Sequence, residues 1–222
     1  MLKRFLIPAF LSLAPSAFAQ TAPSPTEIAG YEGLLRAAHN GNTAEVSRLA
    51  ATGVDINSRD QRHRTAAHVA AYASHDETLR ALAEAGADMN ALEFQTYDVV
   101  TIAAVADDPE LMSLAIELGN DPGLTTSPYD GTALIAAAHL GHVEVVRRLI
   151  KAGAPLDHVN NLGWTALMES VVLGDGGPDH QAVAKLLVEA GADRSIGDFD
   201  GVTPLEHAQD RDFREMVRIL SR

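Results

Sequence analysis

The chain has 222 residues, 46% of them hydrophobic, with a formal net charge of −13 and no cysteine. Such an acidic balance repels phosphate backbones, so nucleic acid is a poor candidate partner. Without cysteine, disulfides, thiolate metal sites and Cys–His catalysis are excluded. No apolar run reaches the length of about 18 residues that a membrane span requires.

The first 19 residues have the pattern of a secretory signal peptide. Lys3 and Arg4 precede an apolar run over residues 5–13, and Ala17-Phe18-Ala19 has the small-x-small form of a cleavage site. We expect cleavage after Ala19, a periplasmic location and a mature net charge of −15, since the leader holds two basic and no acidic residues.

Residues 20–29 contain several Pro, Ser and Thr residues without apolar periodicity, which predicts a flexible lead-in. Beyond them the chain alternates between short amphipathic helices and turns, most regularly over residues 132–154. There, Gly141 separates two helical patterns and Gly153 ends the second. Helices this short are marginal in water, so copies of the unit must stack on one another.

The copies are marked by glycines after each second helix, at spacings of 33, 33, 34 and 38 residues: Gly53, Gly86, Gly119, Gly153 and Gly191. The openings TAAH at Thr65, TALI at Thr132, TALM at Thr165 and TPLE at Thr203 match the T-P-L-H motif. In period and motif the chain resembles ankyrin-repeat proteins.

This resemblance implies an all-α solenoid of about six helix-turn-helix units with β-turn or hairpin fingers. The expected units span residues 30–59, 60–92, 93–126, 127–159, 160–197 and 198–222. Unit three is the most divergent, with Asp98 in the threonine place, and unit six ends in charged residues that predict a polar cap. His63 stands at a finger tip where glycine is usual, which predicts a distorted turn.

Unit five carries about five extra residues around the segment 174–180. Asp175, Asp179 and His180 could ligate a metal there, but their spacing matches no calcium loop, and a plain surface loop is the favoured interpretation. We therefore expect no metal and no cofactor. The resemblance also implies structural roles for His68 and His142.

No catalytic motif is present, so we expect no enzymatic activity. The resemblance implies a concave face of fingers and first helices that grips a partner protein, and aromatic side chains are favoured anchors at such interfaces. An alternative is that the aromatic residues pack between repeats. The candidate partner-binding residues are Arg62, Arg64, Tyr72, Phe94, Tyr97, Tyr129, Trp164 and Phe199. The basic run that contains Arg62 and Arg64 could meet an acidic patch or form a solvated turn.

A concave surface without catalytic groups fits an adaptor or protective binder of another periplasmic protein, and we expect a monomer. The chain also resembles the periplasmic ankyrin proteins of Gram-negative bacteria, which implies a link to oxidative-stress protection. One alternative is an inhibitor or immunity protein against a toxin. An alternative of another class is a metal-dependent hydrolase that uses the inserted loop.

Overall fold

The computed structural model describes residues 21–221, so the expected signal peptide lies outside the described part of the chain. The helices there are α1 (Pro25–Ala29), α2 (Gly33–His39), α3 (Thr43–Ala51), α4 (Ala66–Tyr72), α5 (Asp76–Glu84), α6 (Val99–Ala106), α7 (Pro109–Glu117), α8 (Ala133–Leu140), α9 (Val143–Lys151), α10 (Ala166–Val172), α11 (Pro178–Ala190), α12 (Pro204–Asp210) and α13 (Arg214–Leu220). Within residues 21–221 none of these helices has the length and apolar character to cross a membrane.

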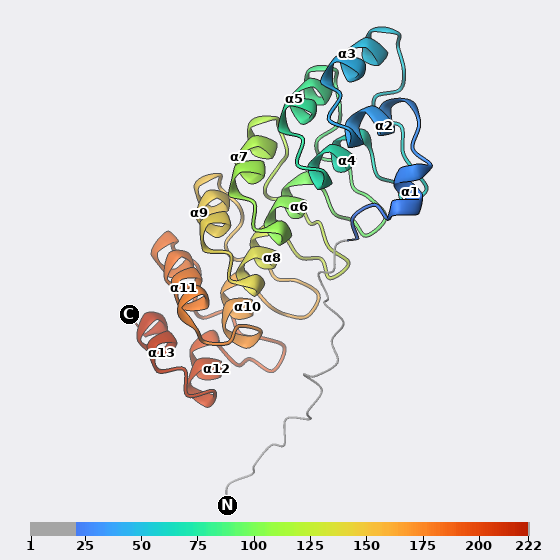
Figure 1. Cartoon of the computed structure of the whole chain (residues 1–222). Coiled ribbons are helices and arrows are strands. Elements are labelled where there is room, and N and C mark those ends of the chain that lie inside the picture. Colours follow the sequence, from blue (N-terminus) through green and yellow to red (C-terminus); the bar gives the residue numbers. More distant parts are fainter. Residues whose placement is uncertain (1–20, 222) are drawn as a thin grey trace, which may run out of the picture.

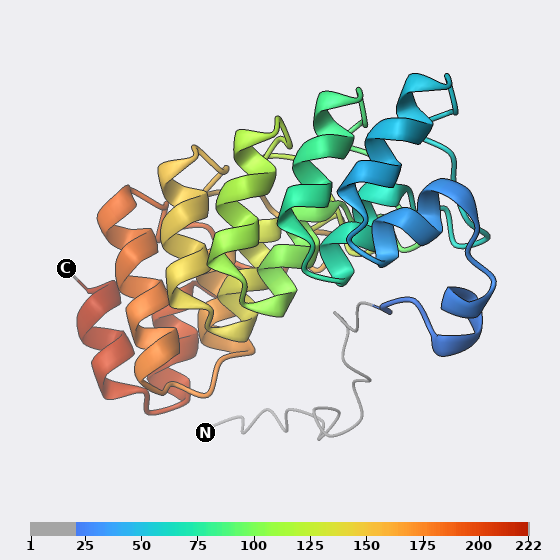
Figure 2. The same cartoon turned by 45° about the horizontal axis from the view of Figure 1, so that its top comes forward.

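From α2 onward the helices form six antiparallel pairs that stack in chain order, which confirms the expected all-α solenoid (Figure 1). The first helices of the pairs make one row and the second helices make the other, and Figure 2 shows the second row side by side from blue to red. Loops that project from the first row form the fingers.

The first helices begin where the sequence places a capping side chain. Thr132 Oγ1 accepts a hydrogen bond from Ile135 N, and Thr165 Oγ1 accepts one from Met168 N. Asp98 replaces threonine in unit three and caps Thr101 N at 2.8 Å, so the divergent residue keeps the same role. Gly141 ends α8 with a φ of 76°, a conformation that glycine adopts without strain.

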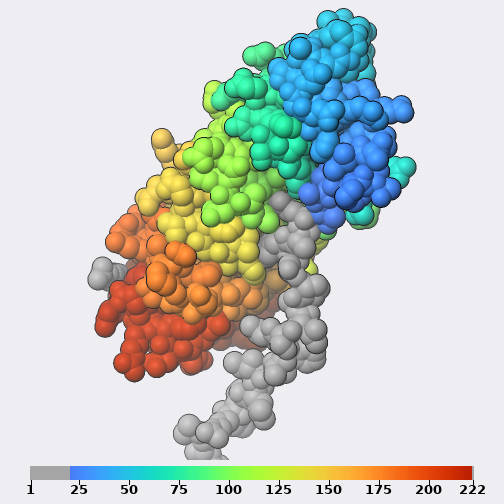
Figure 3. Space-filling model, in the orientation of Figure 1, coloured from blue at the N-terminus to red at the C-terminus, as the bar shows by residue number. Residues whose placement is uncertain are grey.

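One hydrophobic core runs through all the units. The first helices contribute mainly small side chains such as Ala70, Ala103 and Ala137, and the second helices contribute larger ones such as Leu82 and Leu149. Small residues let adjacent first helices approach closely. On the face drawn in Figure 3, successive units adjoin one another from blue to red.

Five fingers, numbered two to six after their units, share one turn, which covers residues 60–64, 93–97, 127–131, 160–164 and 198–202. In each, the fourth N–H donates to the first C=O, as in Thr96 N to Glu93 O at 2.9 Å and Gly163 N to Asn160 O at 3.0 Å. The fourth residue is always left-handed, even where it is His63, with a φ of 60°. The expected distortion at His63 was therefore wrong, because the histidine adopts the conformation of the glycine that it replaces.

Thr96 holds the left-handed place of the third finger with a φ of 66°, which is costly for a β-branched residue. We expect Thr96→Gly to raise the free energy of unfolding by about 0.5–1 kcal/mol, measured by denaturant titration. The reciprocal change Gly163→Thr should destabilise, because a Cβ there would lie 3.1 Å from the Phe199 ring. A loss of stability in Thr96→Gly would contradict this account of the turn.

The lead-in departs from the expected flexible segment, because residues 25–29 form helix α1. Ser24 and Glu27 make a reciprocal capping box, with Pro25 at the first helical position. Hydrogen bonds from Ser24 lower the pKa of Glu27 to about 2. Composition alone does not predict this helix, because contacts with the second unit, such as the ion pair of Glu27 with Arg64, stabilise it.

The inserted residues of unit five lengthen α11 at its start and preserve the register of the unit. His180 lies as far before Gly191 as His142 lies before Gly153. His180 Nε2 donates to His139 O at 2.9 Å, just as His142 Nδ1 reaches Ala104 O at 2.8 Å. The inserted residues thus form an extra helical turn and the loop 174–177, and His180 joins unit five to unit four by a hydrogen bond.

Candidate protein-binding surface

The shared turn gives each finger residue a defined environment. Residues at the second and third places of the five fingers are exposed or partly exposed, whereas the fifth place points inward and is buried in three of the five. We call the fingers of units two to six together with α4, α6, α8, α10 and α12 the finger face. The candidate partner-binding residues on the fingers lie partly at the exposed second and third places and partly at the inward-pointing fifth place.

Phe94 and Phe199 occupy the second place of their fingers and are 66% and 78% exposed. Each ring rests partly on the preceding finger: Phe94 meets the His63 ring edge-on at 6.5 Å, and Phe199 lies over Gly163. Large apolar side chains that are both exposed and held in place are suited to anchor a partner.

Two pairs of neighbouring fingers are also linked through their backbones, those of units two and three and those of units four and five. Phe94 N donates to Arg62 O and Asn161 N donates to Tyr129 O, both at 2.9 Å. Partly exposed Tyr129 and 40% exposed Leu162, both at the third place, extend the apolar surface across the fourth and fifth fingers. Backbone bonds therefore hold Phe94 against the finger of unit two, and Tyr129 against the finger of unit five.

Tyr97 and Arg64 are buried, with exposed fractions of 1% and 0%, so neither is the surface anchor that was expected. Both stand at the fifth finger place, directly before a helix N-cap. The burial of Tyr97 agrees with the alternative for the aromatic residues, packing inside the solenoid. Trp164 stands at the same place but stays partly exposed, so it can contact both its own repeat and a partner.

The basic run of the second unit is not a free cationic patch. Arg64 Nη2 lies 2.5 Å from Glu27 Oε1, and Arg64 Nε lies 2.8 Å from Asp60 Oδ2. Exposed Arg62 pairs with the same Glu27 oxygen at 3.2 Å, and Arg59 donates to backbone carbonyls. The interpretation as a site for an acidic patch was therefore wrong for Arg64, whose charge holds α1 on the second finger.

Tyr72 lies at the end of α4 and is only partly exposed. Its hydroxyl is buried without a hydrogen-bond partner among the described residues. Burial raises the pKa of Tyr72 and also that of Glu93, which is 6% exposed. Both side chains are largely removed from the surface, so they offer little contact area to a partner.

His68 has the structural role that the family motif implies. Thr65 N donates to His68 Nδ1 at 3.2 Å, and His68 Nε2 lies 3.1 Å from Tyr97 O, so the ring is neutral with its proton on Nε2. Burial lowers the pKa of His68 to about 4. If the His68 ring were charged, Nδ1 would also carry a proton, and that proton would face the Thr65 N–H.

This burial predicts an acid-sensitive contribution to stability. Because the folded pKa is below the unfolded value of about 6.5, the contribution is complete above pH ~6.5 and is lost as the pH falls toward ~4, by about 3 kcal/mol. Glu93 and Asp98, whose pKa values burial raises, act in the opposite sense. We therefore expect the stability difference between the parent and His68→Gln to shrink over this range in denaturant titrations. A pH-independent difference would contradict the neutral buried ring.

A buried polar network supports unit three and was not visible from the sequence. Asn120 Nδ2 donates to Asp98 Oδ2 at 2.8 Å and to Asn90 Oδ1 at 3.0 Å, while Asn120 Oδ1 accepts from Val100 N at 3.0 Å. Burial raises the pKa of the Asp98 carboxyl. Asn120 thus compensates for the carboxylate that stands where the motif has threonine.

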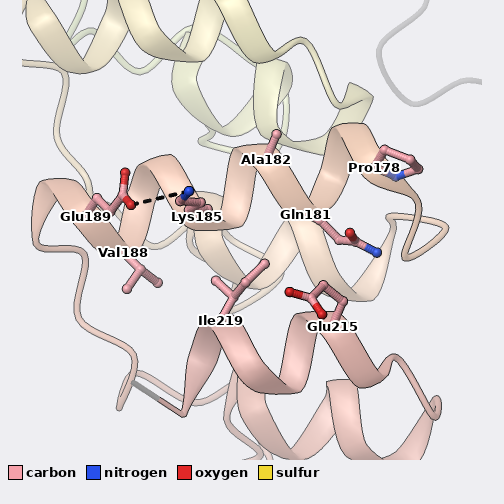
Figure 4. A pocket seen from close by; sticks show the side chains of 8 residues that line it. All are labelled: Pro178, Gln181, Ala182, Lys185, Val188, Glu189, Glu215 and Ile219. Carbon is pink, nitrogen blue, oxygen red and sulfur yellow. Dashed lines mark ion pairs between the residues drawn. The ribbon is translucent and has the colours of Figure 1, made fainter.

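The remaining surface offers less to a partner. A groove of about 460 Å³ lies between α11 and α13 on the second-helix row (Figure 4). Lys185 and Glu189 pair there at 3.8 Å, beside Val188 and Ile219. In the inserted segment, Asp175 pairs with His180 at 3.0 Å, and the other nitrogen of that ring bonds to backbone, so two of the three possible metal ligands serve to hold the loop.

Comparisons with known proteins agree with this architecture. A family model described as ankyrin repeats (3 copies) matches residues 10–93 and 100–198. The chain is 34% identical over 187 residues to the ankyrin repeat protein YahD of Escherichia coli K12, which covers 84% of this chain and 92% of that protein.

Two solved structures have the same fold. An ankyrin repeat domain from Acinetobacter baumannii AYE superposes with a TM-score of 0.80 at 39% identity, covering 85% of this chain and 95% of that one. The ankyrin repeat protein EF0377 superposes with a TM-score of 0.79 at 31% identity, covering 86% and 98%.

Proposed function

Since the chain belongs to the ankyrin-repeat family, we propose that it is a monomeric periplasmic adaptor that binds a partner protein through its finger face. Repeats of this kind are a protein–protein interaction scaffold. The observation that carries the proposal is the set of exposed apolar side chains on the fingers, led by Phe94 and Phe199. Periplasmic location rests on the leader sequence, and a link to oxidative-stress protection rests on the resemblance to periplasmic ankyrin proteins.

A non-catalytic role fits the same surface. The buried carboxylates Asp98 and Glu169 accept hydrogen bonds from Asn120 and Asn160, so both are committed to the packing of their units. The inhibitor alternative uses the same face and differs only in the partner that it would bind. The hydrolase alternative has less support, because the inserted segment is occupied with its own hydrogen bonds.

The test is affinity capture from periplasmic extract with the mature chain and two variants. Phe94→Ser/Phe199→Ser removes the exposed anchors and should weaken capture by about 2 kcal/mol or more, roughly thirtyfold in affinity. Val54→Ser/Lys151→Ser changes exposed residues outside the finger face and should leave capture unchanged. Melting temperatures confirm that both variants fold. Equal capture by all three proteins would contradict the proposal.

A further inference from the structure

Charged side chains are distributed unequally between the two rows of the solenoid. Fingers three to six and helices α6, α8, α10 and α12 contain no lysine or arginine. The second-helix row contains both signs, and they pair with each other, as in Arg148 with Glu110 and Arg147 with Glu144, both at 3.2 Å. The second helices hold ten acidic and eight basic residues, so most of their charge cancels, whereas this part of the finger face carries acidic residues without any lysine or arginine.

The unbalanced charges on the finger face are exposed carboxylates. Asp130, Asp200 and Asp210 are all exposed, and none forms a salt bridge within the described residues. They share the face with the exposed rings of Phe94 and Phe199. Asp200 directly follows Phe199 in the finger of unit six, so an interface that buries this ring would bring that carboxylate close to the partner.

We infer that the partner presents a segment that carries lysine or arginine with apolar side chains between them; this inference rests on the proposed function. Like charges placed opposite one another cost several kcal/mol, so an acidic segment would be rejected. Apolar side chains of the segment would cover the finger rings, while its cations would meet Asp130 on the fourth finger and Asp200 and Asp210 in unit six. The chemistry of the face thus specifies a cationic and partly apolar ligand.

The probe is a library of random 12-residue peptides without tryptophan, displayed on phage and selected on the mature chain. Binding of the selected peptides is measured through the emission of Trp164, the one tryptophan in the sequence, which is partly exposed on the fifth finger. We expect enrichment in lysine, arginine and apolar residues. Raising the salt concentration from 0.05 to 1 M should weaken binding roughly tenfold or more.

Two charge-reversal variants separate local from overall electrostatics. Asp130→Lys/Asp200→Lys/Asp210→Lys should weaken binding of the selected peptides roughly tenfold or more. Glu84→Lys/Glu117→Lys/Glu189→Lys makes the same change in net charge on exposed residues of the second-helix row and should have little effect.

The Phe94→Ser/Phe199→Ser variant distinguishes this inference from the proposed function. Selected peptides that are neutral or acidic, yet lose binding in that variant, would overturn the inference and leave the proposed function standing. Peptides that bind that variant as well as the parent, or a selection that yields no binder, would contradict both. Equal effects of the two charge-reversal variants would overturn the inference alone.

Discussion

Replacing Arg64 with alanine is expected to destabilise the chain by about 3 kcal/mol and to release helix α1. The guanidinium is fully buried and contacts the carboxylates of Glu27 and Asp60, so its loss leaves two carboxylates without their main partner and opens a cavity. Urea denaturation gives the change in stability, and hydrogen exchange of residues 25–29 reports the release of α1.

Arg62→Ala is the matched control, because Arg62 pairs with the same Glu27 oxygen from an exposed position. Exposed ion pairs contribute little, so this variant should lose no more than about 1 kcal/mol and keep α1 protected. If Arg64→Ala were as stable as Arg62→Ala, the buried ion pairs would not hold the N-terminal segment in place.

Asn120→Ala is expected to cost about 2–4 kcal/mol, the second large effect. The change removes a donor to the buried Asp98 carboxylate and leaves Val100 N without its acceptor. Thermal and urea unfolding measure the loss. Exposed Asn161, whose side chain makes one long bond of 3.4 Å to Pro128 O, provides the control, and Asn161→Ala should cost less than about 0.5 kcal/mol.

A second substitution tests the reason for that loss. Adding Asp98→Thr to Asn120→Ala restores the cap used by Thr132 and Thr165 and removes the buried charge, so the double variant should recover part of the lost stability. Additive losses from the two substitutions would show that Asn120 does not act through the carboxylate.

Much of the fold could be predicted because the repeat imposes its own spacing. The glycines at the ends of the second helices and the threonines at the starts of the first helices place the helix pairs without any tertiary information. His68 and His142 have the structural contacts that the resemblance implied. Helix α1 was missed because its sequence reads as a polar, proline-containing linker, and only Arg64 on the second unit reveals its partner.

The candidate site was predicted less well, since a position in the repeat does not by itself give the exposure of a side chain. Phe94 and Tyr97 lie in one finger and were treated alike, yet the turn exposes the first and buries the second. The sequence could have separated them by their places relative to the helix N-cap. The buried position of Arg64 could not be read in this way, because it depends on the packing of α1.

The measurement that tests the central claim most directly is hydrogen exchange of residues 20–222, alone and in complex with the captured partner. If the finger face is the interface, amides of residues 93–97, 127–131, 160–164 and 198–202 should gain protection in the complex. Amides of the second-helix row, α3, α5, α7, α9, α11 and α13, should keep their exchange rates. Protection confined to the second-helix row, with unchanged exchange in the fingers, would contradict the account.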